Sequence, residues 1–336
     1  MQRAKAPKTE EKHKPDSNDP NESCKRSPRD KTALLWFGQT VHRKARAKGR
    51  IILLKRQRLH SSHNQHMQTI ATKIKIAGVA LEVLQIPAPT PDKNRSTIVF
   101  LHEGLGSVAM WRDFPARLCA ATGLAGLVYS RQGYGQSDPV PDVRGAGRLR
   151  PDYMHHEAWD VLPALLAACD ISQAVLLGHS DGGSIALLHA SKFPVVGCMV
   201  MAPHLFVEDI SIRSIAAARQ AYLHNDLRSK LARFHADVDG AFWQWNDVWL
   251  SDAFCGFDIA AQCEKIICPL LAIQGYDDPY GTMAQIDSLA IGFDIKNTVK
   301  PKQNVRKQLL KLEHCGHSPH KDQTQKVVQA VATWLA

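Results

Sequence analysis

Apolar positions in this chain gather in short runs that are separated by longer stretches with helical spacing. Mostly apolar runs lie at 97–101, 126–130, 173–177 and 195–201, and such runs are typical of strands buried on both faces of a parallel sheet. Strands that alternate with helical stretches of roughly ten to fifteen residues indicate parallel βαβ units. Further strands are expected at 269–274 and 309–313, an antiparallel pair within 69–86, and helices at 109–121, 153–169 and 184–191.

The alternation stops between residues 203 and 268, where helical periodicity continues through 212–223 and 227–234. We interpret this segment as a helical cap that is inserted after the sixth strand and covers the site. Trp245 and Trp249 are four residues apart, so they share one face of a helix. The aromatic side chains of this segment either line an apolar acyl or aryl pocket or fill the core of the cap; they are Phe242, Trp243, Trp245 and Trp249.

A glycine-flanked serine follows one of the predicted buried strands. The sequence Gly178-His179-Ser180-Asp181-Gly182 lies between the strand at 173–177 and the helix at 184–191. This is the G-x-S-x-G pattern in the strand–turn–helix context that a nucleophile elbow requires. Glycines are needed there because the strand and helix backbones pass close to each other. The pattern predicts that Ser180 is a nucleophile, and the alternative is a serine in an ordinary glycine-rich loop.

A nucleophilic serine needs a base, and the base needs a carboxylate to orient it. The strand at 269–274 is followed by Asp277 and Asp278, at the sheet edge where ligands bind in open α/β proteins. Either carboxylate could hold an imidazole in one tautomer, and we prefer Asp278, with Asp277 as the alternative.

Three histidines follow the strand expected at 309–313. His317 comes directly after Gly316, and a glycine there permits the sharp loop that returns an imidazole over the serine. We therefore assign His317 as the base. The other two, His314 and His320, are expected to lie in a supporting layer or to face solvent.

An oxyanion hole is the third requirement, because charge stabilisation is usually the largest catalytic contribution. One donor is expected to be the backbone N–H of Asp181, the residue after the nucleophile. The second is expected from the loop after the strand at 97–101, whose glycines let a main-chain N–H point into the site. We place that second donor at Gly104, with Leu105 as the alternative.

The chain from about Gln68 to its end resembles the α/β-hydrolase superfamily. The resemblance implies a mostly parallel central sheet flanked by helices, a Ser180–Asp278–His317 triad and independence from metals and organic cofactors. No His or Cys cluster has the spacing of zinc ligands, which agrees with this. The motifs that carry the resemblance are H-E-G-L-G-S at His102, R-Q-G-Y-G-Q-S at Arg131, G-H-S-D-G-G at Gly178, G-Y-D-D at Gly275 and C-G-H-S at Cys315.

One residue departs from the commoner family pattern. Many relatives have His-Gly where this chain has His102-Glu103. Glu103 is either a carboxylate in the pocket that contacts substrate or an anchor for its own loop. Other possible substrate contacts are His204, Trp243 and Asp181; the carboxylate of Asp181 could instead cap the helix that begins there.

Charge is distributed unevenly along the chain. Residues 1–66 contain 17 Lys and Arg and 6 Asp and Glu, whereas the remainder contains 25 basic and 26 acidic residues. The nearly neutral body at 67–336 gives no reason to expect nucleic-acid binding. The basic extension at 1–66 is predicted to be largely disordered. Two interpretations of this extension are open. It is either a tether to an anionic surface or an organelle-targeting segment, or it is an extension that the folded body does not need. No apolar run is long enough for a membrane span.

Eight cysteines are scattered without a C-x-x-C pair, which fits buried reduced thiols in a cytoplasmic protein. The predicted function is hydrolysis of a carboxylic ester, thioester or lactone through an acyl-enzyme on Ser180. The substrate is expected to be a small molecule with an apolar acyl or aryl part. The alternatives are hydrolysis of a carbon–carbon bond in a diketone-like acid, and non-catalytic ligand binding on the same scaffold. The sequence indicates no oligomeric state.

Overall fold

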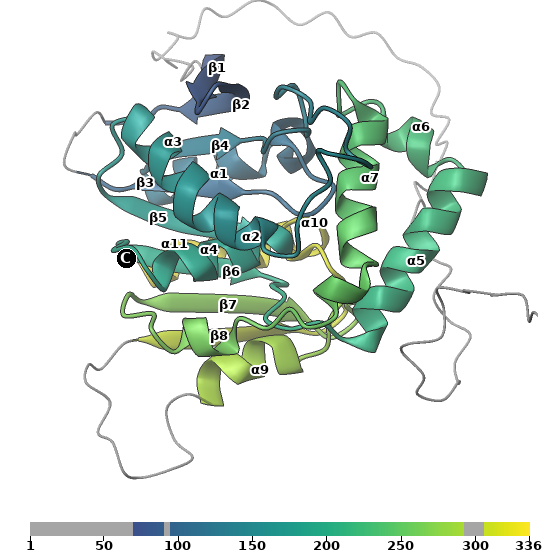
Figure 1. Cartoon of the computed structure of the whole chain (residues 1–336). Helices are drawn as coiled ribbons and strands as arrows, with labels where there is room; N and C mark the ends of the chain where they lie inside the picture. Colours follow the sequence, from purple (N-terminus) through teal and green to yellow (C-terminus); the bar gives the residue numbers. More distant parts are fainter. Residues whose placement is uncertain (1–69, 91–94, 292–305) are drawn as a thin grey trace, which may run out of the picture. The chain divides into compact units, whose positions relative to one another are not determined.

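A single eight-stranded sheet organises the computed structural model, which describes residues 70–90, 95–291 and 306–336 (Figure 1). The strand order is β1-β2-β4-β3-β5-β6-β7-β8. β2 pairs antiparallel with both β1 and β4, and every other neighbouring pair is parallel. The strands are β1 (Ile70–Ile76), β2 (Val79–Ile86), β3 (Thr97–Leu101), β4 (Ala125–Tyr129), β5 (Ala174–His179), β6 (Gly197–Met201), β7 (Leu270–Gly275) and β8 (Lys307–Leu312).

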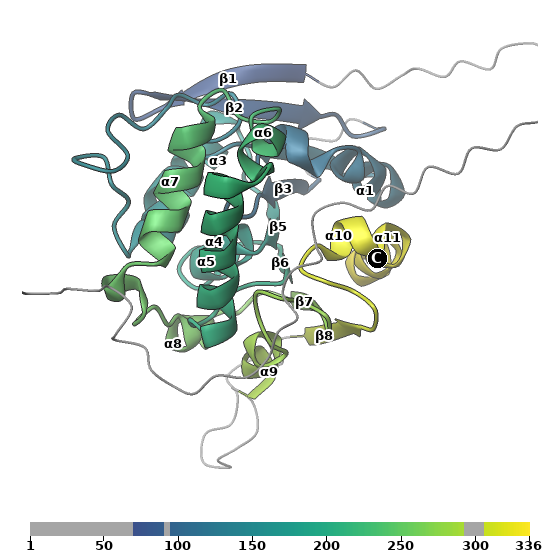
Figure 2. The ribbon, with the colours of Figure 1, turned by 90° about the vertical axis from the view of Figure 1, so that its right-hand side faces the viewer.

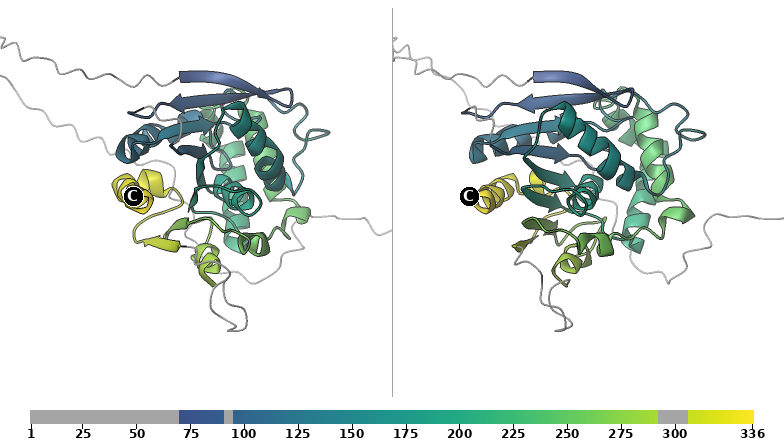
Figure 3. Two further views of the ribbon diagram at one scale, coloured as in Figure 1. Left: turned by 90° about the vertical axis from the view of Figure 1, so that its left-hand side faces the viewer. Right: turned by 60° about the vertical axis from the view of Figure 1, so that its left-hand side comes forward.

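Helices lie on both faces of this sheet, as Figures 2 and 3 show. The α-helices of the described residues are α1 (Phe114–Thr122), α2 (Tyr153–His156), α3 (Leu162–Ala168), α4 (Asp181–Ala190), α5 (Asp209–His224), α6 (Leu227–Leu231), α7 (Val238–Trp249), α8 (Ala260–Cys263), α9 (Ala284–Ile291), α10 (Pro319–Asp322) and α11 (Thr324–Leu335). Two 3₁₀ turns (Val108–Trp111 and Asp252–Phe254) and a π-helical turn (Glu157–Val161) complete the set.

The pleat of the strands divides the core into two layers. Along β3, Ile98 and Phe100 pack with α1 and α11, whereas Val99 and Leu101 pack with α3 and α4. This division follows because successive side chains of a strand point to opposite faces. Because both layers are apolar, the side chains on both faces of each central strand are apolar, and the strand appears in the sequence as a continuous apolar run.

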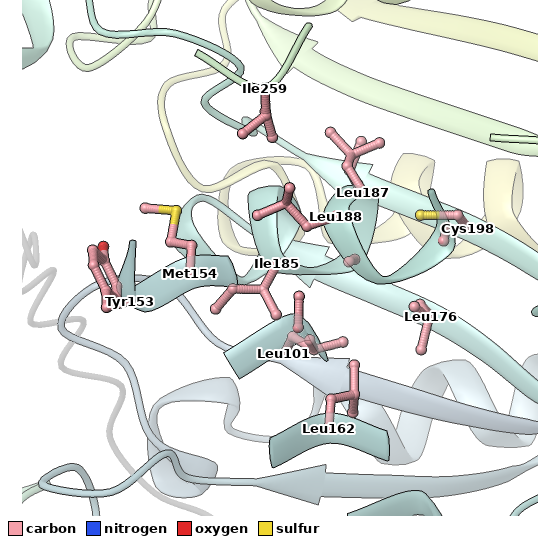
Figure 4. Packing of buried hydrophobic residues seen from close by; sticks show 14 of the residues in the cluster. Leu101, Tyr153, Met154, Leu162, Leu176, Ile185, Leu187, Leu188, Cys198 and Ile259 are labelled. Carbon is pink, nitrogen blue, oxygen red and sulfur yellow. The ribbon is translucent and has the colours of Figure 1, made fainter. Parts of the chain in front are cut away.

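Helix α4 is buried on all sides, and all ten of its residues are buried. In Figure 4, Ile185, Leu187 and Leu188 of this helix lie among side chains from other elements, including Leu101 of β3 and Leu176 of β5. A helix with apolar or small residues on most sides is expected in such a central position. Its first residue follows Ser180, so this packing fixes the turn that carries the serine.

The segment between β6 and β7 forms helices α5 to α8, and α5, α6 and α7 pack against one another (Figures 1 and 2). The rings of Tyr222 on α5 and Phe242 on α7 stack with centroids 3.7 Å apart. Asp237 caps α7 by accepting a hydrogen bond of 2.8 Å from the N–H of Gly240. The predicted fold class, an α/β-hydrolase fold with a helical insertion after the sixth strand, is confirmed.

Two predicted helices are interrupted in the structure. The helix expected at 109–121 is a 3₁₀ turn followed by α1, because Arg112 takes a left-handed φ of 55° and ends the turn. The helix expected at 153–169 consists of α2, the π-helical turn and α3, which begins with Leu162 and Pro163. α9 and α11 were not anticipated from the sequence, and the basic extension at 1–66 lies outside the described residues.

Among the described residues, no helix is long and apolar enough to cross a membrane. The same residues contain no group of three or more His, Cys, Asp and Glu side chains that could hold a metal ion. The seven cysteines in this part of the chain are free thiols, five of them buried; Cys24 lies outside it.

Candidate active site

Ser180 sits on a sharp turn between β5 and α4, with φ of 54° and ψ of −120°. This left-handed conformation is strained for a residue with a side chain, and such strain concentrates at functional sites. The neighbouring glycines are required by space. A Cβ atom on Gly178 would collide with the carbonyl of Gly182, and one on Gly182 would collide with the carbonyl of Leu101. The sequence pattern thus reflects a real backbone constraint.

A continuous chain of hydrogen bonds joins three of the predicted residues. The hydroxyl oxygen of Ser180 lies 2.9 Å from Nε2 of His317. Nδ1 of His317 lies 2.9 Å from each carboxylate oxygen of Asp278. A neutral imidazole that donates through Nδ1 to a carboxylate presents Nε2 as an acceptor, so His317 is arranged to take the proton of Ser180.

Asp278 is oriented by two further donors. Oδ2 accepts from Nε2 of Gln274 at 2.8 Å, and Oδ1 accepts from the backbone N–H of Tyr280 at 2.8 Å. Burial alone would raise the pKa of Asp278, but the charge and hydrogen bond of His317 outweigh it and hold the pKa below its usual value. Asp278 is therefore ionised at neutral pH beside the imidazole.

The other candidates for the carboxylate and the base do not take part in this hydrogen-bonded chain. Asp277 is exposed, and its backbone N–H donates to the carbonyl of Cys315. His314 is exposed with a φ of 53°. His320 is buried against the rings of Trp111 and His179, in a supporting layer behind the site.

The two predicted oxyanion donors come from different elements. The N–H of Asp181 lies in the first turn of α4, where a helix has no internal acceptors for its N–H groups. Gly104 packs directly against the indole ring of Trp245. The contact is so close that a Cβ atom on Gly104 would collide with the indole Nε1 and Cδ1. A larger residue at this position would therefore displace the loop or the cap helix α7.

Arg131 holds the loop that carries Gly104. Its guanidinium donates to the carbonyls of His102 at 2.6 Å and Glu103 at 3.0 Å. The ring of His102 bonds the same Glu103 carbonyl through Nδ1 at 2.6 Å and accepts the backbone N–H of Arg131 through Nε2 at 3.0 Å. This accounts for the arginine in the R-Q-G-Y-G-Q-S motif.

The side chain of Glu103 faces the supporting layer. One oxygen lies 3.4 Å from Nδ1 of His179, and the other lies 3.4 Å from Nζ of Lys321. Nε2 of His179 in turn bonds the carbonyl of His317 at 2.6 Å. Burial opposes ionisation of Glu103, but Lys321 and His179 outweigh it and hold its pKa well below the ordinary value. These contacts favour the anchor interpretation, since they tie the Gly104 loop to the His317 loop.

Glu103→Gln is expected to lower the free energy of unfolding by about 1 kcal/mol at pH 7, because a neutral amide loses most of its attraction to Lys321 and His179. A carboxyl whose pKa is depressed in the folded state stabilises the fold above its unfolded pKa of about 4.3 and loses that effect as pH falls through the folded pKa. The difference between wild type and variant should therefore shrink with acidification. Urea unfolding across that pH range, with the exposed Glu264→Gln as control, measures it; a difference that grows toward acid pH would contradict the assignment.

Asp181 is held by the helix α2 and by the cap. The hydroxyl of Tyr153 donates to Oδ2 of Asp181 at 2.5 Å and accepts from Nε1 of Trp249 at 3.1 Å. Burial raises the pKa of Asp181, partly opposed by the charge of Arg131. The carboxylate is thus engaged by protein donors next to Ser180.

His204 and Trp243 differ in position. The His204 ring lies 5.8 Å from that of His317 and 4.9 Å from that of Trp249. Burial, with the neighbouring His317, lowers the pKa of His204 to about 3, so its imidazole is neutral. Its Nδ1 has no hydrogen-bond partner among the described residues. Trp243 instead contacts the guanidinium groups of Arg144 and Arg219, at 4.2 and 5.4 Å from its ring.

Of three aromatic residues near the site, two were not predicted, and Trp245 was expected either to line an apolar pocket or to fill the core of the cap. Tyr153 bonds Asp181, Tyr280 lies 4.7 Å from His317 between ring centroids, and Trp245 covers Gly104. The shared helical face of Trp245 and Trp249 indicated packing in the core of the cap at least as much as a place in the site. No sequence pattern pointed to Tyr153 or Tyr280, because their proximity arises only from the packing of α2 and the β7 loop.

Comparison with known proteins agrees with this architecture. The sequence profile of the Alpha/beta hydrolase family matches residues 98–330. The chain therefore belongs to the alpha/beta hydrolase family, which indicates a hydrolase.

Several solved structures share the fold. A meta-cleavage product hydrolase from Pseudomonas fluorescens has a TM-score of 0.58 and 17% identity, over 78% of this chain and 96% of that one. An enol-lactonase from Burkholderia xenovorans has a TM-score of 0.56 and 17% identity, over 79% and 99%. A proline iminopeptidase from Mycobacterium smegmatis has a TM-score of 0.56 and 16% identity, over 79% and 97%. Identities this low show the fold alone.

Proposed function

We propose that this protein is a serine hydrolase that cleaves a carboxylic ester, thioester or lactone through an acyl-enzyme on Ser180. The observation that carries the proposal is the unbroken hydrogen-bonded chain from the hydroxyl of Ser180 through His317 to Asp278. A ligand-binding protein has no use for all three residues in this arrangement, whereas acyl transfer requires each of them.

The first half of the reaction forms the acyl-enzyme. Oγ of Ser180 attacks the carbonyl carbon while Nε2 of His317 takes its proton, and the carbonyl oxygen becomes a tetrahedral oxyanion. The N–H groups of Asp181 and Gly104 stabilise that charge. Collapse of the intermediate breaks the bond to the leaving group, which receives the proton from His317. Asp278 stabilises the imidazolium without itself being protonated.

The second half releases the acid. His317 takes a proton from water, and the resulting hydroxide adds to the acyl carbon to form a second tetrahedral intermediate. Its collapse breaks the bond to Oγ of Ser180, which regains its proton from His317. The carboxylic acid leaves and the enzyme returns to its starting state.

An apolar acyl or aryl part of the substrate fits the surroundings of Ser180. Trp245 covers Gly104, Tyr280 and His204 lie beside His317, and Trp249 contacts His204. His204 adds a neutral imidazole with an unpartnered nitrogen. These groups favour an aromatic or branched apolar substrate with one polar atom over a charged one.

A series of p-nitrophenyl esters of increasing acyl length tests the proposed chemistry. We expect burst release of p-nitrophenol, with kcat/KM rising with chain length until the cap limits it. A 2-hydroxy-6-keto dienoic acid assayed in parallel separates the alternative, hydrolysis of a carbon–carbon bond. Turnover of the keto acid without turnover of any ester would show that the enzyme hydrolyses a carbon–carbon bond instead. If neither substrate is turned over and a fluorophosphonate does not label Ser180, the protein is better described as a binding protein.

Gly104→Ala is expected to lower kcat about 10²-fold, because the added methyl collides with Trp245 and moves a proposed oxyanion donor. KM should change less than kcat, since the donor acts mainly on the transition state. Steady-state kinetics measure both. Gly256→Ala is the matched control, since a Cβ atom there meets no atom within 4 Å. An unchanged kcat in Gly104→Ala would show that Gly104 is not the second oxyanion donor and would favour Leu105 in that role.

A further inference from the structure

The loop that follows Asp278 is held by helix α5 of the cap. The hydroxyl of Ser214 donates to the carbonyl of Pro279 at 2.5 Å, and the hydroxyl of Ser211 donates to the carbonyl of Tyr280 at 2.5 Å. The two serines are three residues apart on α5, so they lie on one face of that helix. The cap and the loop after the carboxylate are therefore joined at two consecutive carbonyls.

The two serines differ from most serines in helix interiors. A serine there usually faces solvent or bonds a carbonyl one turn earlier in its own helix. Here Ser211 is buried, Ser214 is half-buried, and both hydroxyls reach another segment of the chain. Separating the two segments would leave buried polar groups without partners, which is costly. These contacts therefore hold the 279–282 loop against α5.

The Ser214 bond reaches Asp278 through a single peptide group. The carbonyl of Pro279, which accepts from Ser214, and the N–H of Tyr280 belong to the same planar peptide. That N–H donates to Oδ1 of Asp278 at 2.8 Å. Because the peptide is planar, holding its oxygen also directs its N–H, and each hydrogen bond of such a chain polarises the next. The hydrogen-bonded chain of the triad thus continues into the cap.

The N–H of Tyr280 also bears on the charge of Asp278. Burial alone would raise the pKa of this carboxyl, and the N–H acts together with His317 to hold the pKa below its usual value. Gln274 on β7 supplies the other support, since its amide donates to Oδ2 of Asp278 at 2.8 Å and to the carbonyl of Gly281 at 3.2 Å. The carboxylate is therefore held from the sheet through one oxygen and from the cap through the other.

Helix α5 is in turn joined to α7. Nδ2 of Asn246 on α7 donates to the carbonyl of Ile215 on α5 at 3.1 Å. The same helix α7 packs Trp245 against Gly104. The two cap helices thus contact both the loop after Asp278 and the loop of the proposed oxyanion donor.

We propose that Ser211 and Ser214 are positioning residues, which hold the 279–282 loop and thereby keep the triad carboxylate directed at the imidazole. The inference rests on the proposed function, because the carboxylate needs this orientation only if the imidazole takes a proton from Ser180. Removal of the two hydroxyls frees the loop from α5, whereas the support from Gln274 remains. The expected loss of reactivity is therefore partial, and much smaller than that from loss of the carboxylate itself.

The rate at which a fluorophosphonate labels Ser180 in the full chain tests this proposal, because that rate depends on the triad rather than on the natural substrate. The double variant Ser211→Ala with Ser214→Ala should be labelled about tenfold more slowly than the wild type. Ser214→Thr keeps the hydroxyl and should be labelled nearly as fast as the wild type. Ser251→Ala is the matched control, since it removes a half-buried cap hydroxyl that donates to the carbonyl of Val248 at 2.7 Å, and it should not change the rate.

Proton NMR gives a second measurement that needs neither substrate nor probe. The proton between Nδ1 of His317 and Asp278 is expected far downfield, because it is shared with a carboxylate. It should move upfield in the double variant as that hydrogen bond lengthens. This signal decides the inference even if the wild type is inert to the fluorophosphonate, a result that would count against the proposed function alone.

A double variant that is labelled at the wild-type rate, with an unmoved downfield signal, would overturn the proposal. An equal loss of rate in Ser251→Ala would also overturn it, as would a Ser214→Thr variant that is as slow as Ser214→Ala. In both of these cases the loss would arise from the general packing of the cap and not from the two hydroxyls.

Discussion

Ser180→Ala is expected to lower kcat for ester hydrolysis by about 10⁶, to a rate that owes nothing to covalent catalysis. The variant keeps the oxyanion donors and the substrate pocket, so the Kd of the ester should change little, whereas KM should rise toward Kd because no acyl-enzyme accumulates. The proposed proton acceptor, Nε2 of His317, is 2.9 Å from the hydroxyl that the variant removes. Single-turnover kinetics with a p-nitrophenyl ester measure the effect.

Ser172→Ala is the matched control, because Ser172 is exposed and precedes β5 at the end of the strand opposite to the turn. It should leave turnover unchanged. A Ser180→Ala enzyme that retained a tenth of wild-type kcat, with a normal thermal midpoint, would exclude covalent catalysis at this residue.

Asp278→Asn is expected to lower kcat by about 10⁴. The amide can still contact His317, but it donates a hydrogen bond to Nδ1 and so favours the tautomer in which Nε2 carries the proton. That tautomer cannot accept the proton of Ser180. Burial and one of the two bonds, from Gln274 or from the Tyr280 N–H to the single amide oxygen, keep the substituted side chain in place.

Asp277→Asn is a particularly close control for this variant, because the two residues are adjacent and only Asp278 contacts His317. Asp277 is exposed, and its backbone N–H donates to the carbonyl of Cys315. We expect Asp277→Asn to retain nearly full kcat in the same assay. The reverse pattern, with a large loss in Asp277→Asn and none in Asp278→Asn, would assign the orienting role to Asp277.

The nucleophile turn could be predicted because the residues it requires stand close together in the sequence. Gly178 is needed for its contact with the backbone of Gly182, and Gly182 for its contact with the carbonyl of Leu101 on β3, so the two glycines flank Ser180 as a short motif. The positions of Asp278 and His317 could be predicted for a related reason: each follows a strand, and the carboxyl ends of parallel strands meet at one edge of the sheet.

The supporting contacts could not be predicted, because each joins residues far apart in sequence. Glu103 reaches Lys321 and His179, and Tyr153 reaches Asp181 and Trp249. No spacing along the chain encodes such pairs. Sequence periodicity shows which residues share a helix face, but it does not show which face meets the site.

The helix α7 illustrates this limit. Trp243 was a candidate substrate contact, yet its ring lies against Arg144 and Arg219, whereas Trp245 lies over Gly104. The two tryptophans are only two residues apart, which turns them to different sides of the helix. The rotation of α7 about its axis, set by its packing against α5, decides which of the two tryptophans covers Gly104.

The central claim is that Ser180 is an activated nucleophile, and its most direct test is covalent labelling. After incubation of the full chain with a fluorophosphonate, mass spectrometry of the digested protein should find one adduct, on the peptide that contains Ser180, and Asp278→Asn should form it much more slowly. An unlabelled protein, or an adduct on a different residue, would contradict the account.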